Sequence, residues 1–208
     1  MRKNKFFLYI FIIVALFLIV NLSPLQDFIF SFRSFIEPKI YERIEKSWRN
    51  KTNDFLLRQV NSANNAYSGI ATSILVERKE KKAIPILLKQ TKSWNKQTRI
   101  SAFIALGEIG DPSVIEPFMK IVRNGRENPQ FLNAIDALSI MRYETIYSEI
   151  LKMVNDGYHT SWAVDMLERF PEKPETLPAL EKIANSDTEE YIKYKAKQAM
   201  EKISKMAH

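Results

Sequence analysis

The residue types that usually carry catalysis or metal binding are scarce in this chain. Its 208 residues include no cysteine and only two histidines, His159 and His208. Without a thiol there is no disulfide framework, cysteine nucleophile or cysteine-ligated metal. One non-terminal histidine cannot supply the several donors that a metal site needs. No glycine-rich phosphate loop or nucleophile-elbow pattern occurs either. The sequence therefore predicts no catalytic residue, no metal site and no bound cofactor.

Any catalysis would have to rest on aspartate and glutamate alone. Carboxylate pairs such as Glu189 with Glu190, or Glu108 with Asp111, fall at the ends of predicted helices. Carboxylates at helix ends usually serve as solvated caps. We therefore expect a protein that is not an enzyme, and the question becomes which elements the sequence builds instead.

The beginning of the chain has the pattern of a membrane segment. The basic stretch MRKNK precedes an apolar run at residues 6–22 in which Asn21 is the only strongly polar residue. Cleaved signal peptides and uncleaved anchors share this start, whereas a buried core helix would alternate polar and apolar faces. A cleavage site ending at Ser23 would have Asn21 where a small residue is needed and Pro24 directly after it. We expect an uncleaved transmembrane anchor, within a first segment at residues 1–24.

The charges around this anchor predict its orientation. Arg2, Lys3 and Lys5 lie before the apolar run, and few uncompensated basic residues follow it. By the positive-inside rule, the N-terminus lies in the cytoplasm. We therefore expect a single-pass protein of a bacterial cell membrane, with the remaining chain extracytoplasmic. Nucleic acid is not an expected partner there, despite a formal net charge of +7.

A helical connecting segment is expected at residues 25–51. Apolar residues recur in it every four positions, which is a helical stripe, and Pro38 divides the stripe because proline favours the first turn of a helix. The stripe either packs on the following domain as an N-terminal cap or lies on the membrane surface. Its members are Phe28, Phe32, Ile36, Ile40, Ile44 and Trp48.

From residue 81 onward the chain repeats itself. Ala102 aligns with Ala134, Ala163 and Ala196, so the offsets are 32, 29 and 33 residues. Around each alanine, apolar residues at i, i+3, i+4 and i+7 form one face of a helix, and a shorter amphipathic helix precedes each of them. Each unit is thus a predicted helix–turn–helix. The four faces are Ala102, Ala105, Leu106 and Ile109; Ala134, Ala137, Leu138 and Met141; Ala163, Met166, Leu167 and Phe170; and Ala196, Ala199, Met200 and Ile203.

One junction between units is chemically explicit. Gly110 suits a left-handed helix end, Asp111 can cap the next helix, and Pro112 is tolerated in its first turn. With Arg99 and the apolar face, the string ALGEIGDPSVIEPFMKIV at residues 105–122 resembles the HEAT-like repeat family, in the short form also found in phycobilisome lyases. The resemblance implies an all-α fold, a right-handed α-solenoid of helix–turn–helix repeats whose second helices line the concave side. It does not imply bilin chemistry, because the short repeat occurs in unrelated proteins.

The expected organisation is therefore an anchor, the connecting segment and a HEAT-like repeat domain at residues 52–208. Clear repeats cover residues 81–203, and a fainter copy precedes them.

Two groups of residues are candidate contact sites. On the predicted second helices, Trp162 stands out because its counterparts in the other units are polar or small, and it is either an anchor for a protein partner or a packed side chain. The basic start of the first clear repeat either meets anionic head groups or forms a solvated edge. The candidate protein-binding residues are Asn133, Asp136, Trp162, Asp165 and Arg169, and the candidate membrane-surface residues are Arg78, Lys79, Lys81 and Lys82.

These expectations favour a non-enzymatic, membrane-anchored scaffold that presents an extracytoplasmic surface to a protein partner and contacts the membrane through residues 6–22. One alternative is an accessory subunit of a larger membrane complex, in which the anchor packs against other spanning helices. Another is a lyase-like enzyme subunit.

The predicted topology can be tested by protease protection. Protease added to spheroplasts should digest the repeat domain, while a tag fused before Arg2 stays protected, because the positive-inside rule keeps that end in the cytoplasm. The untreated protein should sediment with membranes at full length. A soluble product that begins after Ser23 would contradict the anchor.

Overall fold

The computed structural model describes residues 38–62, 64–186 and 188–206. Within these ranges every regular element is helical and no strand occurs, which confirms the predicted all-α class. The predicted anchor at residues 6–22 lies outside the described residues, as do residues 25–37 of the connecting segment. Among the helices that the structure describes, none is long and apolar enough to cross a membrane.

The helices come in pairs that follow one another along the chain. The first helices are α2 (Asn53–Val60), α4 (Ile84–Gln90), α6 (Ile115–Arg123), α8 (Tyr147–Asn155) and α10 (Thr176–Ala184). The second helices are α3 (Asn65–Glu77), α5 (Lys96–Ile109), α7 (Phe131–Ile140), α9 (Thr160–Leu167) and α11 (Glu190–Met206). Short 3₁₀ helices, η1 (Lys81–Ala83), η2 (Pro112–Val114) and η3 (Glu144–Ile146), lead into α4, α6 and α8.

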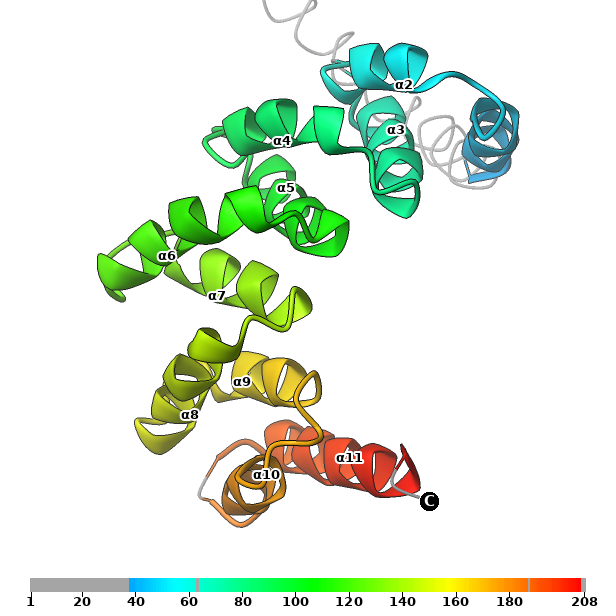
Figure 1. Ribbon diagram of the computed structural model, residues 1–208. Helices are drawn as coiled ribbons and strands as arrows, with labels where there is room; N and C mark the ends of the chain where they lie inside the picture. Colours follow the sequence, from blue (N-terminus) through cyan, green and yellow to red (C-terminus); the bar gives the residue numbers. More distant parts are fainter. Residues whose placement is uncertain (1–37, 63, 187, 207–208) are drawn as a thin grey trace, which may run out of the picture.

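The pairs stack in chain order along a curve, with the second helices on its inner side (Figure 1). Along this side α5 packs against both α3 and α7, and α11 packs against α9. We call the side where the second helices begin, with residues 91–95 before α5, the start edge. The side where they end, with residues 78–80 after α3 and 110–111 after α5, is the end edge.

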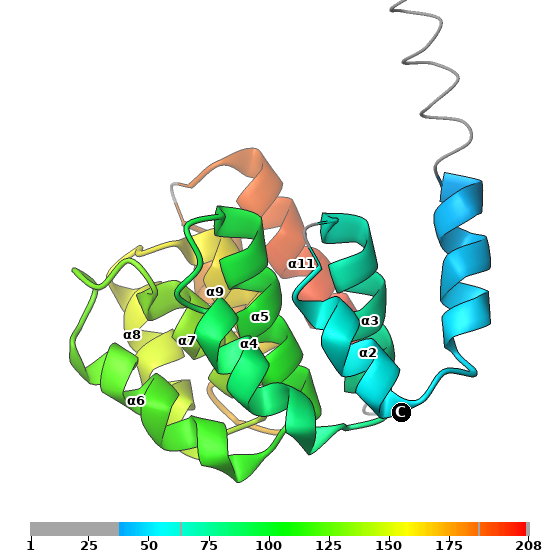
Figure 2. The same cartoon turned by 90° about the horizontal axis from the view of Figure 1, so that it is seen from above.

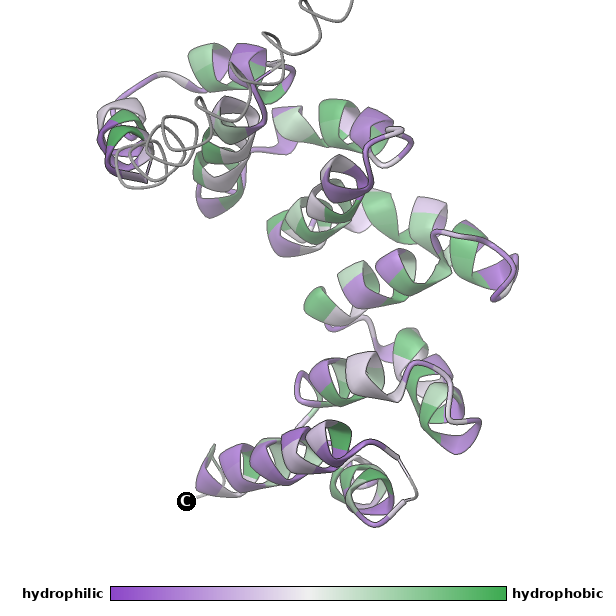
Figure 3. Cartoon of the chain, turned by 180° about the vertical axis from the view of Figure 1, so that it is seen from behind, coloured by the Kyte–Doolittle hydropathy of each residue, from purple (hydrophilic) through white to green (hydrophobic). Residues whose placement is uncertain are grey.

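The predicted apolar face is the buried one. Ala102 is 1% exposed, and Ala134, Ala163 and Ala196 are fully buried. Two predicted members, Met141 and Met200, are only half-buried. Met141 follows the last residue of α7, and Met200 belongs to α11, the last helix described. Figure 3 shows that most helices contain both hydrophobic and hydrophilic residues and that α11 is largely hydrophilic.

Small residues allow two second helices to touch through their backbones. A Cβ atom added at Gly107 of α5 would lie 2.7 Å from the carbonyl oxygen of Ala137 in α7. Such a separation is shorter than carbon and oxygen atoms tolerate, so only glycine allows this approach. Between α3 and α5 the spacing is looser, since a Cβ atom at Gly69 would meet nothing within 4 Å.

The predicted Gly-Asp-Pro turn is confirmed. Gly110 ends α5 in the left-handed region with φ 73°, the Asp111 side chain accepts a hydrogen bond from the Ser113 backbone N–H, and Pro112 opens η2. Two residues aligned with Gly110 keep the same backbone without being glycine, Lys79 at φ 53° and Arg142 at φ 54°. The turn geometry therefore persists in units that lack the Gly-Asp-Pro sequence.

The turn that follows α9 has a different structure. Pro171 aligns with Gly110, and its ring excludes a positive φ, so residues 168–175 form a longer connection. The fully buried Thr176 holds it: its hydroxyl lies 2.7 Å from the carbonyl oxygen of Phe170 and 3.0 Å from the hydroxyl of Tyr147. Burial raises the pKa of Tyr147, so its phenol stays a neutral hydrogen-bonding group.

The described end of the connecting segment packs on the first pair. Residues 38–48 are helical, and the Trp48 ring stacks edge-on against Phe55 and Tyr67 with centroids 5.2 and 5.5 Å apart. Tyr41 contacts Tyr67 near the start of α3, whereas Arg49, just after the helix, pairs with Glu77 at the end of α3. This helix therefore runs parallel to α3, and its first residue, residue 38, lies on the start edge (Figure 2).

Candidate functional site

A hollow of about 240 Å³ lies on the inner side of the curve, over α5, α7 and α9. Four of the five candidate protein-binding residues border it, although they come from two different units. The fifth, Asn133, is half-buried on α7 and is not part of its lining. The lining consists of the predicted Asp136, Trp162, Asp165 and Arg169, together with Ile100, Ile104 and Met166.

Trp162 combines the two roles that its sequence position left open. Its side chain is half-buried and packs against the hydrophobic core. It also lines the hollow, beside Ile100 and Ile104 from the neighbouring helix α5. The indole therefore has one side fixed by the fold and another available to a ligand, and together with the two isoleucines it makes the apolar part of the hollow.

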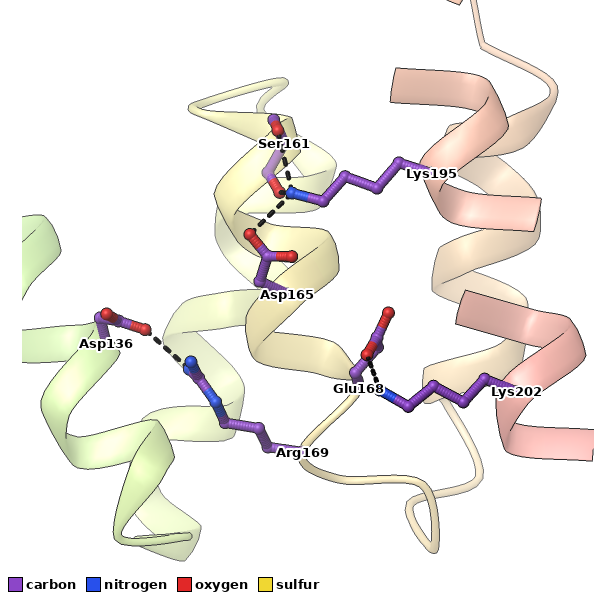
Figure 4. Close-up of polar contacts among 7 residues, drawn as sticks. All are labelled: Asp136, Ser161, Asp165, Glu168, Arg169, Lys195 and Lys202. Carbon is purple, nitrogen blue, oxygen red and sulfur yellow. Dashed lines mark hydrogen bonds and ion pairs between the residues drawn. The ribbon is translucent and has the colours of Figure 1, made fainter. Parts of the chain in front are cut away.

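Arg169 ties the polar part of the hollow together. Its guanidinium lies 2.7 Å from the Asp136 carboxylate (Figure 4). It also donates to the Ser139 hydroxyl. The Arg169 and Asp136 side chains are 30% and 20% exposed, so solvent screens this pair less than an open surface pair. The contact joins the end of α9 to α7, one repeat away.

A second set of ion pairs joins α9 to α11 on the same inner side. The Lys195 ammonium lies 2.7 Å from the Asp165 carboxylate and donates to the backbone carbonyl of Ser161 at 2.8 Å. Lys202 pairs with Glu168 at 2.7 Å (Figure 4). The polar rim of the hollow is therefore paired within the chain, which fixes the positions of its charges.

A larger hollow, about 300 Å³, lies between α3 and α5. Small and hydroxylated residues line it, including Ser68, Gly69, Thr72 and Ser101, and Ile104 borders both hollows. The looser α3–α5 spacing at Gly69 leaves this space open. The inner side thus carries two adjoining recesses, one lined mostly by small side chains and one lined by aromatic and aliphatic side chains.

The described residues offer little for catalysis or metal binding. No group of three or more His, Asp or Glu side chains in the described ranges could hold a metal ion. His159 is exposed and adopts a left-handed backbone, φ 47°, just before α9. Its ring contacts Tyr158 with centroids 4.6 Å apart, and it does not line the hollow of Trp162.

The four candidate membrane-surface residues lie on the end edge, and three of them bind neighbouring elements. Arg78 donates to the backbone carbonyls of Arg49 and Lys51, at 2.7 and 2.9 Å. Lys79 donates to the Glu108 carbonyl at the end of α5. Lys82 is exposed. This edge is opposite the one that carries residue 38.

Lys81 makes the remaining contact of this group. Its ammonium lies 2.8 Å from the carboxylate of Asp111 in the following turn. The Lys81 hydrogen bond, aided by the donors of Ser113, holds the pKa of Asp111 well below its usual range. Asp111 therefore stays ionised as a helix cap and as the partner of a lysine one repeat earlier. Contact of these basic residues with head groups stays a prediction.

No protein-family model matches this chain, and no curated protein is similar to it. The HEAT-like resemblance therefore rests on the aligned faces and the Gly-Asp-Pro turn.

The sequence pattern did not identify Ile100 and Ile104 as part of the inner surface. They are half-buried and lie four residues apart on α5, beside the buried face of Ala102, Ala105 and Leu106. The sequence did contain a sign of their position, because Ile100 and Ile104 are an apolar i, i+4 pair in addition to the four residues of the core face. The pairing of Asp165 with Lys195 had no such signal, because the two residues lie in different units.

A double-mutant cycle measures how strongly the Arg169 pair couples α7 and α9. Replacing Asp136 and Arg169 by alanine, singly and together, should give a coupling free energy of about 0.5–2 kcal/mol, because the pair is partly shielded and also bonded to Ser139. The control is the exposed pair Glu201–Lys205 within α11, whose side chains are 67% and 75% exposed. Urea unfolding of each variant measures both couplings. Equal coupling in the two pairs would contradict a joining role for Arg169.

Proposed function

We propose that this protein is a membrane-anchored α-solenoid scaffold of HEAT-like repeats, non-enzymatic, whose concave inner surface binds a protein partner on the extracytoplasmic side. The helix pairs stacked in chain order, the buried alanine positions and the left-handed turns at a common register support the repeat assignment. The right-handed sense and the family come from the resemblance of residues 105–122. Such arrays present extended concave surfaces to partners.

The observation that carries the binding role is the hollow around Trp162. Protein interfaces concentrate their binding energy in a few aromatic and arginine residues that sit in shielded positions. Here Trp162, Ile100 and Ile104 supply apolar surface inside a recess of about 240 Å³. The surrounding Asp136, Asp165 and Arg169 are already paired, so a partner does not have to supply charges for them.

The membrane part of the proposal rests on residues 6–22. Their apolar run after three basic residues supports a single span with the N-terminus in the cytoplasm. Tethering raises the local concentration of the repeat domain at the membrane, where an envelope or membrane protein is the expected partner. A role as an accessory subunit of a membrane complex would use the same inner surface.

Site-specific photo-crosslinking in intact cells tests the inner surface directly. A photoreactive phenylalanine analogue in place of Ile104, which borders both hollows, should give an adduct of defined mass with a partner protein. The matched control replaces Ser148, an exposed residue of α8, which is the first helix of its pair and lies away from the inner side (Figure 1). Trp162→Ala should reduce the Ile104 adduct about thirtyfold if the indole is an anchor worth about 2 kcal/mol.

Thermal melting of the same variants separates binding from folding. Trp162 is half-buried, so Trp162→Ala should lower the stability of the isolated protein but leave it folded at the growth temperature. Equal adducts from Ile104 and Ser148, or an Ile104 adduct that survives Trp162→Ala in a folded protein, would contradict the proposal.

A further inference from the structure

One large apolar side chain in the described residues has no cover at all. Trp94, in the α4–α5 connection on the start edge, is 100% exposed. Trp48 and Trp162, in contrast, are half-buried and pack against the core. A bare indole at the tip of a loop is unfavourable in water, and tryptophan prefers an environment that is apolar at one end and wet at the other.

The fold fixes the loop that presents this indole. The Arg99 guanidinium donates to the carbonyl oxygens of Ser93 and Trp94, at 2.8 and 3.0 Å. The Asn95 side chain caps α5 by accepting from the Thr98 N–H at 3.0 Å. On the other side, Gln130 donates to the carbonyl of Thr91 at 2.9 Å. The loop backbone is therefore anchored at several points while the Trp94 side chain points away from the core.

The surroundings of Trp94 are basic. Residues 91–96 read TKSWNK, with Lys92 and Lys96 on either side and no acidic residue. Both lysines are exposed. Lysines beside a membrane surface are attracted to anionic lipids, and tryptophan at the head-group level anchors proteins at the interface.

We propose that Trp94, with Lys92 and Lys96, docks the start edge of the repeat domain on the head-group region of an anionic bilayer. The proposal rests on the membrane anchorage proposed above. Residue 38, from which the chain continues toward the predicted anchor, lies on this same edge (Figure 2), and nearby Ile40 is 45% exposed. The choice of this edge depends on Trp94 and its two lysines.

A bilayer fits this surface better than a protein partner does. Trp94 lines neither of the hollows on the inner side, whereas anchors of protein interfaces sit in shielded recesses. Farther along the start edge acidic residues enter the exposed surface: Glu127 lies beside Arg126 before α7, and Glu189 and Glu190 lie at the start of α11. The exposed Tyr191 follows these two glutamates directly, whereas the loop of Trp94 has no acidic residue, so the proposed contact is confined to the first units.

Quenching by brominated lipids in vesicles tests this contact on the full-length chain. The chain is reconstituted into vesicles of phosphatidylglycerol and phosphatidylcholine, with bromine near the head-group end of the acyl chains. The Trp94 signal is the difference between wild type and Trp94→Phe. It should be blue-shifted and quenched by the bromolipid, whereas aqueous acrylamide should quench it less than in the detergent-solubilised chain.

Variants and lipid composition separate this contact from others. Lys92→Glu with Lys96→Glu should remove most of the Trp94 quenching, and so should vesicles of phosphatidylcholine alone. Trp162→Phe is the matched control and should leave the Trp94 signal unchanged. Trp94→Phe should not shift the melting temperature, because the Trp94 side chain packs on nothing.

The outcomes distinguish this inference from the anchorage itself. If the chain floats with vesicles but Trp94 is quenched by acrylamide and not by bromolipid, the docking is wrong while the anchor stands. A blue-shifted Trp94 that bromolipid does not quench would indicate a protein contact and would also overturn the docking. If the chain does not float at all, both the anchor and the docking fall.

Discussion

The contact that the rest of the structure depends on is the backbone approach of α5 to α7. At Gly107 there is no room for a side chain, because a Cβ atom would lie 2.7 Å from the Ala137 carbonyl oxygen and 3.2 Å from the Ile140 Cβ. Fully buried alanines such as Ala134 and Ala163 also present small side chains where the second helices pack. Since helices can approach only as closely as their interface residues allow, small residues set the spacing of the array.

That spacing decides what the inner surface can hold. Because α5 packs closely on α7, Ile104 of α5 lines the same hollow as Asp136 of α7. Trp162 and Arg169 of the following unit line that hollow too. Looser packing at Gly69 leaves the second hollow between α3 and α5. The ion pairs that cross from one second helix to the next, such as Lys195 with Asp165, then hold neighbouring units in register. The proposed binding surface is thus a direct consequence of where the chain places its glycines and alanines.

Much of this fold could be predicted from the sequence, because helical periodicity is a local property. The alignment of Ala102 with Ala134, Ala163 and Ala196 identified four buried positions, and the Gly110 turn was predicted residue by residue. The left-handed backbones of Lys79, Arg142 and His159 were not predicted, since a non-glycine residue gives no local sign of a conformation that its neighbours impose. The predicted anchor at residues 6–22 lies outside the described residues and stays a prediction.

The candidate site was predicted in part. The positions opposite the core face led to Asp136, Trp162, Asp165 and Arg169, which share one hollow. Their partners could not be read in advance, because a contact such as Arg169 with Asp136 depends on the rotation between successive units. The contacts of Arg78, Lys79 and Lys81 could not be predicted either. In the sequence they form a basic run typical of a membrane contact, but in the structure they bind neighbouring elements.

Calorimetry of two glycine-to-alanine variants tests the central claim most directly. Gly107→Ala should destabilise the protein by about 1–3 kcal/mol, because the added methyl group forces α5 away from α7. Gly69→Ala, on α3 where the site is open, should stabilise it by about 0.5–1 kcal/mol through helix propensity alone. A Gly107→Ala protein as stable as Gly69→Ala would contradict the claim that backbone contact between the second helices sets the architecture.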